Sequence, residues 1–226
     1  METNARRLAV ITGASSGLGL DLARQCAQHN YDLIVAADEA SILDAAEELA
    51  AGGITVRPVQ CDLSTPEGVD ALRGAIMASG KPADILIANA GREERGCTVD
   101  ERLTDARAYI DGTINLIDQV SRSMRGRGQG RILITYSIAG LVQETSHAAH
   151  HSHKAFLNVF AKALCRELRH TAVTVACLTA GMNGSNLFDR SARTGYDTMM
   201  KGERSVVRGR GNPLGLSAAI IVPGFL

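Results

Sequence analysis

The stretch at residues 7–19 reads RLAVITGASSGLG and passes from a short apolar run into a glycine-rich turn. An apolar run of this length predicts a buried strand, and the apolar spacing after the glycines predicts a helix. Gly13, Gly17 and Gly19 let the backbone turn tightly and approach a ligand, while the free N–H groups at the helix start favour a pyrophosphate. The stretch therefore predicts a strand, a turn and a helix that bind a dinucleotide.

A glycine turn alone could be a purely structural turn and not a dinucleotide site. The next apolar run helps to distinguish these two interpretations. Residues 31–37 form a second apolar run that ends at Asp38 and Glu39. A carboxylate roughly 20 residues beyond a glycine turn is spaced to meet the adenosine ribose hydroxyls. Asp38 would bind the ribose diol and repel a 2′-phosphate, which favours NAD over NADP as the cofactor.

Further apolar runs continue the same alternation. Residues 56–63 and 84–91 each read as a strand followed by helical periodicity. Strands alternating with helices predict an α/β fold, a doubly wound parallel sheet of the Rossmann-like kind with helices on both faces. Ligands of such sheets bind at the carboxyl ends of the strands, where every motif so far lies. A length of 226 residues with 45% hydrophobic residues suits one domain over residues 1–226.

Five motifs in this order resemble the short-chain dehydrogenase/reductase family over about residues 6–190: TGASSGLG from residue 12, Asp62-Leu63, Asn89-Ala90-Gly91, Ser137 and Lys154. The resemblance implies an NAD(P)-dependent oxidoreductase that interconverts a small alcohol and a carbonyl. In that family the glycine segment cradles the pyrophosphate, and an Asp-Leu pair flanks the adenine. The implied cofactor contacts are Gly13, Ser15, Gly17, Leu18, Asp38, Asp62, Leu63, Asn89, Gly91 and Lys154.

The family's catalytic serine, tyrosine and lysine are only partly matched. Ser137 and Lys154 stand at the serine and lysine positions, but His150 replaces the tyrosine, 13 residues after Ser137 and four before Lys154. Imidazole has a pKa near ~6.5 and exchanges a proton at neutral pH, although its ring is shorter than a phenol. Two hypotheses stand: an oxidoreductase with Ser137, His150 and Lys154 as catalytic residues, and a catalytically inactive nucleotide-binding or assembly protein of the same fold.

Two other family features are altered. The asparagine that supports a proton-relay water is replaced by Tyr109 when counted back from the fifth strand, or by Thr113 when counted forward from Asn89; Asn115 fits neither count. A substrate-loop region is expected at about residues 182–200, in shortened form. These changes leave the substrate undefined beyond a small molecule.

A cluster of histidines precedes Lys154: His147, His150, His151 and His153. Their i,i+3 and i,i+4 spacing allows two imidazoles on one helical face, as in a metal site. No acidic or cysteine ligand accompanies them at a recognisable distance. The sequence therefore favours a partly solvated helix entrance, and no metal is expected.

The charge and the cysteine content of the chain bear on its binding partners and its cellular location. Lys and Arg number 24, as do Asp and Glu, which argues against a nucleic-acid or membrane footprint. Five scattered cysteines and a polar start without a signal peptide indicate a cytoplasmic protein. The helix expected at residues 155–164 is apolar on more than one side, which predicts a homodimer or homotetramer. Residues 218–226 suit a last strand or a contact surface.

Overall fold

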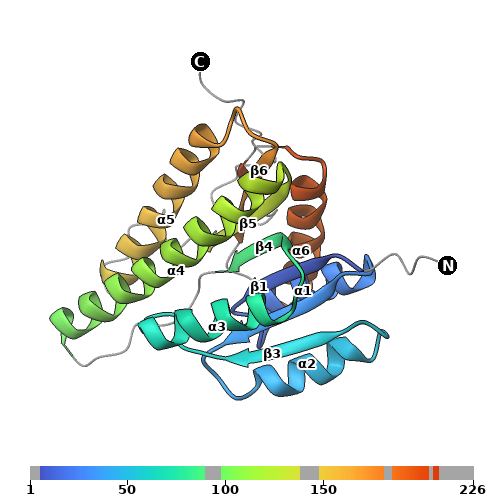
Figure 1. The fold of residues 1–226 in the computed structure, drawn as a ribbon. Helices are drawn as coiled ribbons and strands as arrows, with labels where there is room; N and C mark the ends of the chain where they lie inside the picture. Colours follow the sequence, from blue (N-terminus) through green and yellow to red (C-terminus); the bar gives the residue numbers. More distant parts are fainter. Residues whose placement is uncertain (1–5, 90–97, 138–147, 181–184, 204–205, 209–226) are drawn as a thin grey trace.

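The computed structural model describes residues 6–89, 98–137, 148–180, 185–203 and 206–208. Strands and helices alternate along these ranges (Figure 1). The strands are β1 (Leu8–Thr12), β2 (Asp32–Ala37), β3 (Val56–Gln60), β4 (Ala83–Asn89), β5 (Gly130–Ser137), β6 (Val173–Ala180) and β7 (Val206–Arg208). The helices are α1 (Gly17–Gln28), α2 (Ile42–Ala50), α3 (Pro66–Ala78), α4 (Val99–Arg127), α5 (Ala148–Glu167) and α6 (Ser185–Met200).

Within the described ranges, seven parallel strands form one sheet in the order β3-β2-β1-β4-β5-β6-β7. The chain builds outward from β1 to β3, returns to the centre at β4, and then builds outward in the other direction. This reversal confirms the doubly wound prediction. In such sheets ligands bind in the crevice at the carboxyl ends of the strands where the order reverses, here between β1 and β4.

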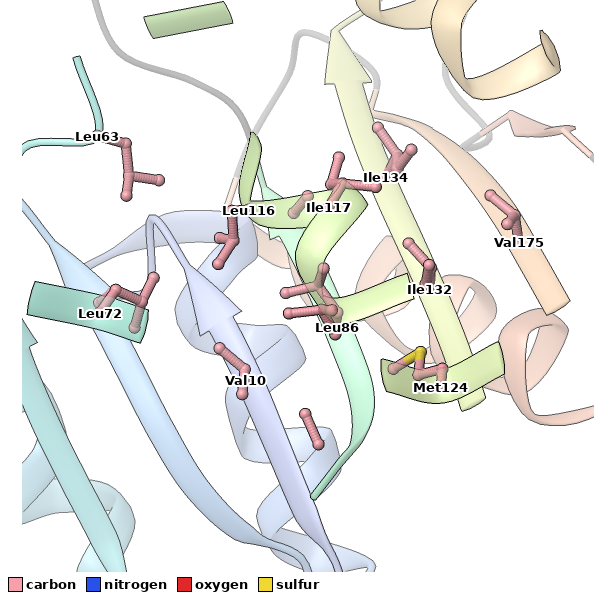
Figure 2. Packing of buried hydrophobic residues seen from close by; sticks show 14 of the residues in the cluster. Val10, Leu63, Leu72, Leu86, Leu116, Ile117, Met124, Ile132, Ile134 and Val175 are labelled. Carbon is pink, nitrogen blue, oxygen red and sulfur yellow. The ribbon is translucent and has the colours of Figure 1, made fainter. Parts of the chain in front are cut away.

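Helices cover both faces of the sheet. One core cluster joins the strands to α1, α2 and α6, and the other joins them to α3, α4 and α5 (Figure 1). All five residues of β1 are buried because a parallel strand in this position faces helices on both sides. Figure 2 shows the second cluster, in which Val10, Leu86 and Ile132 of the sheet meet Leu116 and Met124 of α4. Burial of each such side chain contributes about 1.5–3 kcal/mol.

The helix ends follow local sequence signals. Thr65 caps α3 by accepting a hydrogen bond from the Gly68 N–H at 3.1 Å, and proline occupies the first turn. Thr98 and Glu101 form a reciprocal capping box at the start of α4. The helix ends at Gly128, whose φ of 68° is the left-handed conformation that glycine adopts readily. The basic segment around residues 122–131 is therefore the end of α4 and the turn that leads into β5.

Two C-terminal elements differ from expectation. β7 was not predicted, because Val206–Arg208 is too short to give a periodic signal. Most of the predicted substrate-loop region at 182–200 forms α6, whose Ala192, Tyr196 and Met199 are buried against the sheet and α1. Contact of this region with a substrate stays a prediction. Residues 209–226, including the apolar tail, lie outside the described residues, and no helix within the described ranges has the length and hydropathy to cross a membrane.

A partly buried ion pair ties together the amino ends of three strands. Asp32, at the start of β2, accepts hydrogen bonds from the Lys81 ammonium and, at 2.9 Å, from the Thr55 N–H. Burial opposes the charge of Asp32, but these hydrogen bonds and the Lys81 charge together lower its pKa below the usual value. Asp32 therefore stabilises the fold in its ionised form.

Asp32→Asn should lower the free energy of unfolding by about 1–2 kcal/mol at pH 7, because Lys81 loses its buried partner. The folded-state pKa of Asp32 is depressed, so its contribution is present above the unfolded pKa of about 3.9 and is lost as the pH falls through the folded pKa. Urea unfolding at pH 7 and at lower pH measures this. Asp118→Asn, in the exposed pair with Arg122, serves as the control and should change stability by less than about 0.5 kcal/mol. An equal loss in both variants at pH 7 would contradict the assignment.

Candidate active site

The glycine turn after β1 is shaped by close backbone contacts. Gly13 and Gly17 have φ angles of 62° and 54°. A Cβ atom on Gly19 would lie 1.9 Å from the Gly13 carbonyl oxygen, so no side chain fits there. A Cβ atom on Gly17, in contrast, would meet no described atom within 4 Å. Gly13 and Gly19 are needed for packing, whereas Gly17 keeps a space beside the helix start clear.

The start of α1 has the features of an anion site. The N-cap residue Ser16 is extended and its side chain makes no capping hydrogen bond, and the first turn of α1 contains no acidic residue. The first N–H groups of the helix and the positive end of its dipole are therefore available to a phosphate. Leu18 is buried beneath them, and Ser15 is half-buried, with its hydroxyl 3.5 Å from Glu39 Oε2.

Asn89 connects the turn to two strands. Its Nδ2 donates to the Gly13 carbonyl oxygen at 3.1 Å, and its Oδ1 accepts from the Thr135 hydroxyl at 2.6 Å. Its backbone N–H donates to Thr12 Oγ1 at 3.2 Å. The predicted residue Asn89 therefore lies at the sheet centre, where it fixes the glycine turn to β4 and β5.

Acidic residues gather beyond the ends of β2 and β3. Asp38 directly follows β2, and its carbonyl oxygen accepts from Gln60 Nε2 at 3.2 Å. Asp62 follows β3, and its Oδ1 accepts from the Ser64 N–H at 2.8 Å and from its hydroxyl at 2.7 Å. Burial, and then the charges of Asp62 and Asp38, raise the pKa of the Cys61 thiol to about 11. The thiol is therefore neutral at pH 7, and both carboxylates lie within its electrostatic reach.

Two glycines that the sequence analysis did not single out hold the segment after β3. A Cβ on Gly68 of α3 would lie 2.0 Å from the Asp62 carbonyl oxygen, and one on Gly112 of α4 would lie 1.8 Å from that of Leu63. The Leu63 side chain is buried in the core cluster of Figure 2. The buried side chain of Leu63 therefore has a packing role in addition to the cofactor contact that the resemblance implies. Only the tertiary approach of two helices reveals the need for these glycines.

The structure describes the backbone of the three residues that are expected to be catalytic. Ser137 is the last residue of β5, beyond the Thr135 that pairs with Asn89. His150 and Lys154 lie in the first turns of α5, one helical turn apart, because the helix begins at Ala148, earlier than the expected start at residue 155. Their side chains, and all of Gly91 and His147, lie outside the described residues. The described residues contain no group of three or more metal-ligating side chains.

Both positions proposed for the replaced asparagine lie on one face of α4. Tyr109 and Thr113 are one turn apart and buried, and the Thr113 hydroxyl has no hydrogen-bond partner among the described residues. Asn115 is exposed and accepts a hydrogen bond from Gln119, which agrees with its exclusion from the sequence counts.

The glycine turn, the Asn89 contacts and the doubly wound sheet can now be compared with known proteins. Residues 7–194 match the family model described as short chain dehydrogenase. The chain belongs to the short-chain dehydrogenase family. This family comprises oxidoreductases that bind NAD or NADP, and it accounts for the strand order and for the glycine turn at the sheet centre.

Relatives of this short-chain dehydrogenase span several reductases. An uncharacterised oxidoreductase from Myxococcus xanthus (strain DK1622) is 34% identical over 188 residues, covering 80% of this chain and 74% of its own length. The solved structure of L-sorbose reductase from Gluconobacter frateurii, complexed with NADPH and L-sorbose, is 31% identical with a TM-score of 0.70, covering 77% of this chain and 68% of its own. An actinorhodin polyketide ketoreductase variant with NADPH is 29% identical with a TM-score of 0.74, covering 87% and 78% respectively.

Asn89→Ala should destabilise this short-chain dehydrogenase by about 2–3 kcal/mol, because the Gly13 carbonyl and the Thr135 hydroxyl both lose a partner in a crowded region. Equilibrium urea unfolding followed by circular dichroism measures the change. Asn115→Ala, at an exposed position on α4, is the matched control and should change stability by less than about 0.5 kcal/mol. The central role of Asn89 would be contradicted if both variants unfolded at the same denaturant concentration.

Proposed function

We propose that this short-chain dehydrogenase binds NAD in preference to NADP and interconverts a small alcohol and a carbonyl. The observation that carries the proposal is the space kept clear by Gly17 beside the uncapped amino end of α1. This cradle fits a pyrophosphate, because phosphate oxygens can accept from the free N–H groups. Asp38 and Asp62 lie beyond the neighbouring strands, where the adenosine half of a cofactor would extend.

The preference for NAD rests on negative charge. Asp38 is half-buried at the end of β2, Glu39 follows it, and Glu39 lies within 3.5 Å of the Ser15 hydroxyl in the glycine turn. A carboxylate accepts hydrogen bonds from a ribose diol and repels a 2′-phosphate. The L-sorbose reductase and ketoreductase structures contain NADPH, so this preference would separate the chain from those two relatives.

The chemistry would be divided between the cofactor and three side chains. NAD supplies the hydride acceptor when bound. Ser137 would hold the substrate oxygen, His150 would exchange its proton, and Lys154 would grip the nicotinamide ribose. An imidazole with its ordinary pKa of about 6.5 is mostly neutral at pH 7 and is then a better base than acid, so alcohol oxidation should exceed carbonyl reduction at neutral pH.

The alternative is a nucleotide-binding protein of this fold without hydride transfer. His150 is the residue that favours it, because imidazole is shorter than phenol and a displacement of about 1 Å is costly in rate. Substrate identity is also proposed only as a class. A small-molecule substrate is proposed from the reaction type of the family. The segments expected to line the substrate pocket lie outside the described residues.

We also propose that the chain forms a homodimer or homotetramer through α5. Phe156 and Val159 are 44% and 67% exposed on this helix, and the Phe156 ring lies parallel to that of Phe160 with centroids 6.4 Å apart. A second copy of the same helix would cover these apolar side chains. Within one chain, the opposite side of α5 packs on β5 and β6 through Leu157, Ala161 and Leu164.

Calorimetric titration should give micromolar affinity for NADH and at least tenfold weaker binding of NADPH. Gly17→Ala should weaken NADH binding by tenfold or more, because the new methyl group enters the space assigned to the pyrophosphate. Gly53→Ala is the matched control, since Gly53 has a φ of 78°, a Cβ atom on it would meet no described atom within 4 Å, and it precedes β3 at the amino ends of the strands, away from the turn after β1. Both variants carry a similar backbone strain of about 1–2 kcal/mol, but only the first should lose affinity. Absence of binding by either nucleotide would end the dinucleotide proposal.

His150→Tyr should raise turnover in a screen of alcohols with NAD and carbonyls with NADH, because it restores the longer proton-exchanging side chain. Initial rates across pH 6–10 measure the effect. His170→Tyr, near the far end of α5, is the matched control and should leave the rates unchanged. Bound nucleotide with no turnover in the wild-type protein and in His150→Tyr would favour the inactive alternative.

A further inference from the structure

Several buried polar groups lie near the amino ends of the strands. The proposed cofactor site lies at the carboxyl ends, on the other side of the sheet's centre. Tyr31 and Tyr196 are each only 1% exposed, and neither phenol hydroxyl has a hydrogen-bond partner within the described residues. The same is true of the buried Arg131 Nε and Thr174 Oγ1. Buried polar groups are almost always paired, so these donors require a hydrogen-bond acceptor that the described residues do not supply.

These groups lie on the same face of the sheet. Arg131 pairs with Thr174 in the register of β5 and β6. Each lies two residues before a residue of the core cluster that contains Tyr31 and Tyr196, namely Leu133 and Ala176. Because alternate strand residues share a face, Arg131 and Thr174 lie under α1 and α6 with the two tyrosines.

The polar and aromatic contacts of Tyr31 and Tyr196 within the described residues involve their rings and not their hydroxyl groups. The His29 ring stacks on Tyr196 with centroids 4.4 Å apart, and the Arg7 guanidinium lies 5.0 Å from the centroid of the Tyr31 ring. Arg131 Nη2 donates to the carbonyl oxygen of Met200, one turn after Tyr196 in α6, at 3.3 Å. The phenols and the guanidinium thus approach one region from β2, β5 and α6.

The chemistry of this region suits an anion. Burial raises the pKa of both tyrosines, and the charges of Arg7 and Arg131 act on each of them, so the phenols are neutral hydrogen-bond donors near both cations. The Asp84 carboxylate also lies in range of Tyr31, but it already accepts from the Leu8 N–H at 3.4 Å and from Gln129 Nε2 at 3.2 Å. The partly buried guanidinium of Arg131 and the exposed one of Arg7 face one carboxylate, which leaves an excess of positive charge.

We propose that Tyr31, Tyr196 and Arg131 form a binding site for a small inorganic anion of the size of chloride. The anion accepts from the two phenol hydroxyls and from Arg131 Nε, with Thr174 as a further donor. It bridges the segment between α1 and β2, which carries Tyr31, to α6 and to the start of β5. The site is distinct from the cofactor site, which lies at the other end of the strands.

Urea unfolding of the full chain, with sodium chloride replaced by sodium gluconate at constant ionic strength, tests this site. A ligand that binds only the folded state multiplies the folding equilibrium constant by about ten for each tenfold rise in its concentration above Kd. The wild-type protein should show this chloride dependence. Tyr196→Phe and Tyr31→Phe remove only an unpaired hydroxyl, so both should fold and lose most of the dependence.

Tyr109→Phe is the matched control, because Tyr109 lies on the opposite face of the sheet, and it should keep the chloride dependence of the wild type. Crystals soaked in bromide give a second readout, in which an anomalous peak within hydrogen-bond distance of the two hydroxyls and Arg131 Nε supports the site. A stability that does not respond to chloride, or a response shared by all three variants, overturns the proposal and leaves an internal water as the occupant.

Discussion

The contacts of Asn89 are the constraint on which the rest of the site depends. One side chain joins the turn after β1, the end of β4 and, through Thr135, the adjacent β5. These contacts require that Gly13 and Gly19 carry no side chain, since Cβ atoms there would overlap Asn89 or the turn itself. The close approach places the amino end of α1 over the sheet centre, where its dipole and free N–H groups can act on a ligand.

The sequence predicted the architecture well because parallel strands covered on both faces are continuous apolar runs, as in β1 and β2. The sequence did not predict features that depend on contacts between distant segments of the chain. Gly68 and Gly112 look like ordinary helix glycines, and only the backbone of Asp62 and Leu63 shows why a methyl group is excluded. The unpaired hydroxyls of Tyr31 and Tyr196 were equally hidden, because residues 165 positions apart meet only in the fold.

In the candidate active site, the sequence likewise predicted where residues lie better than what they do. The resemblance assigned the glycines, Asn89 and Asp62 to the cofactor, and these residues lie at or just beyond the carboxyl ends of β1, β4 and β3, while their contact with a cofactor stays a prediction. Ser137, His150 and Lys154 fall at the expected places on β5 and α5, and the one-turn interval between His150 and Lys154 agrees with a single catalytic face. What an imidazole does there depends on ångström-scale reach and on local charge, neither of which is encoded in a motif.

The order of strands also has a consequence for how the chain assembles. β1 pairs with β2 nearby in sequence, but the bond from Asn89 to Gly13 spans 76 residues. A nascent chain that has been synthesised only as far as β3 contains the glycine turn but not β4, whose Asn89 binds that turn. Such long-range pairing is slow compared with local helix formation. Nucleotide binding should therefore appear late in synthesis, after β4 has joined β1, and a ligand present at that stage would select the correctly paired sheet.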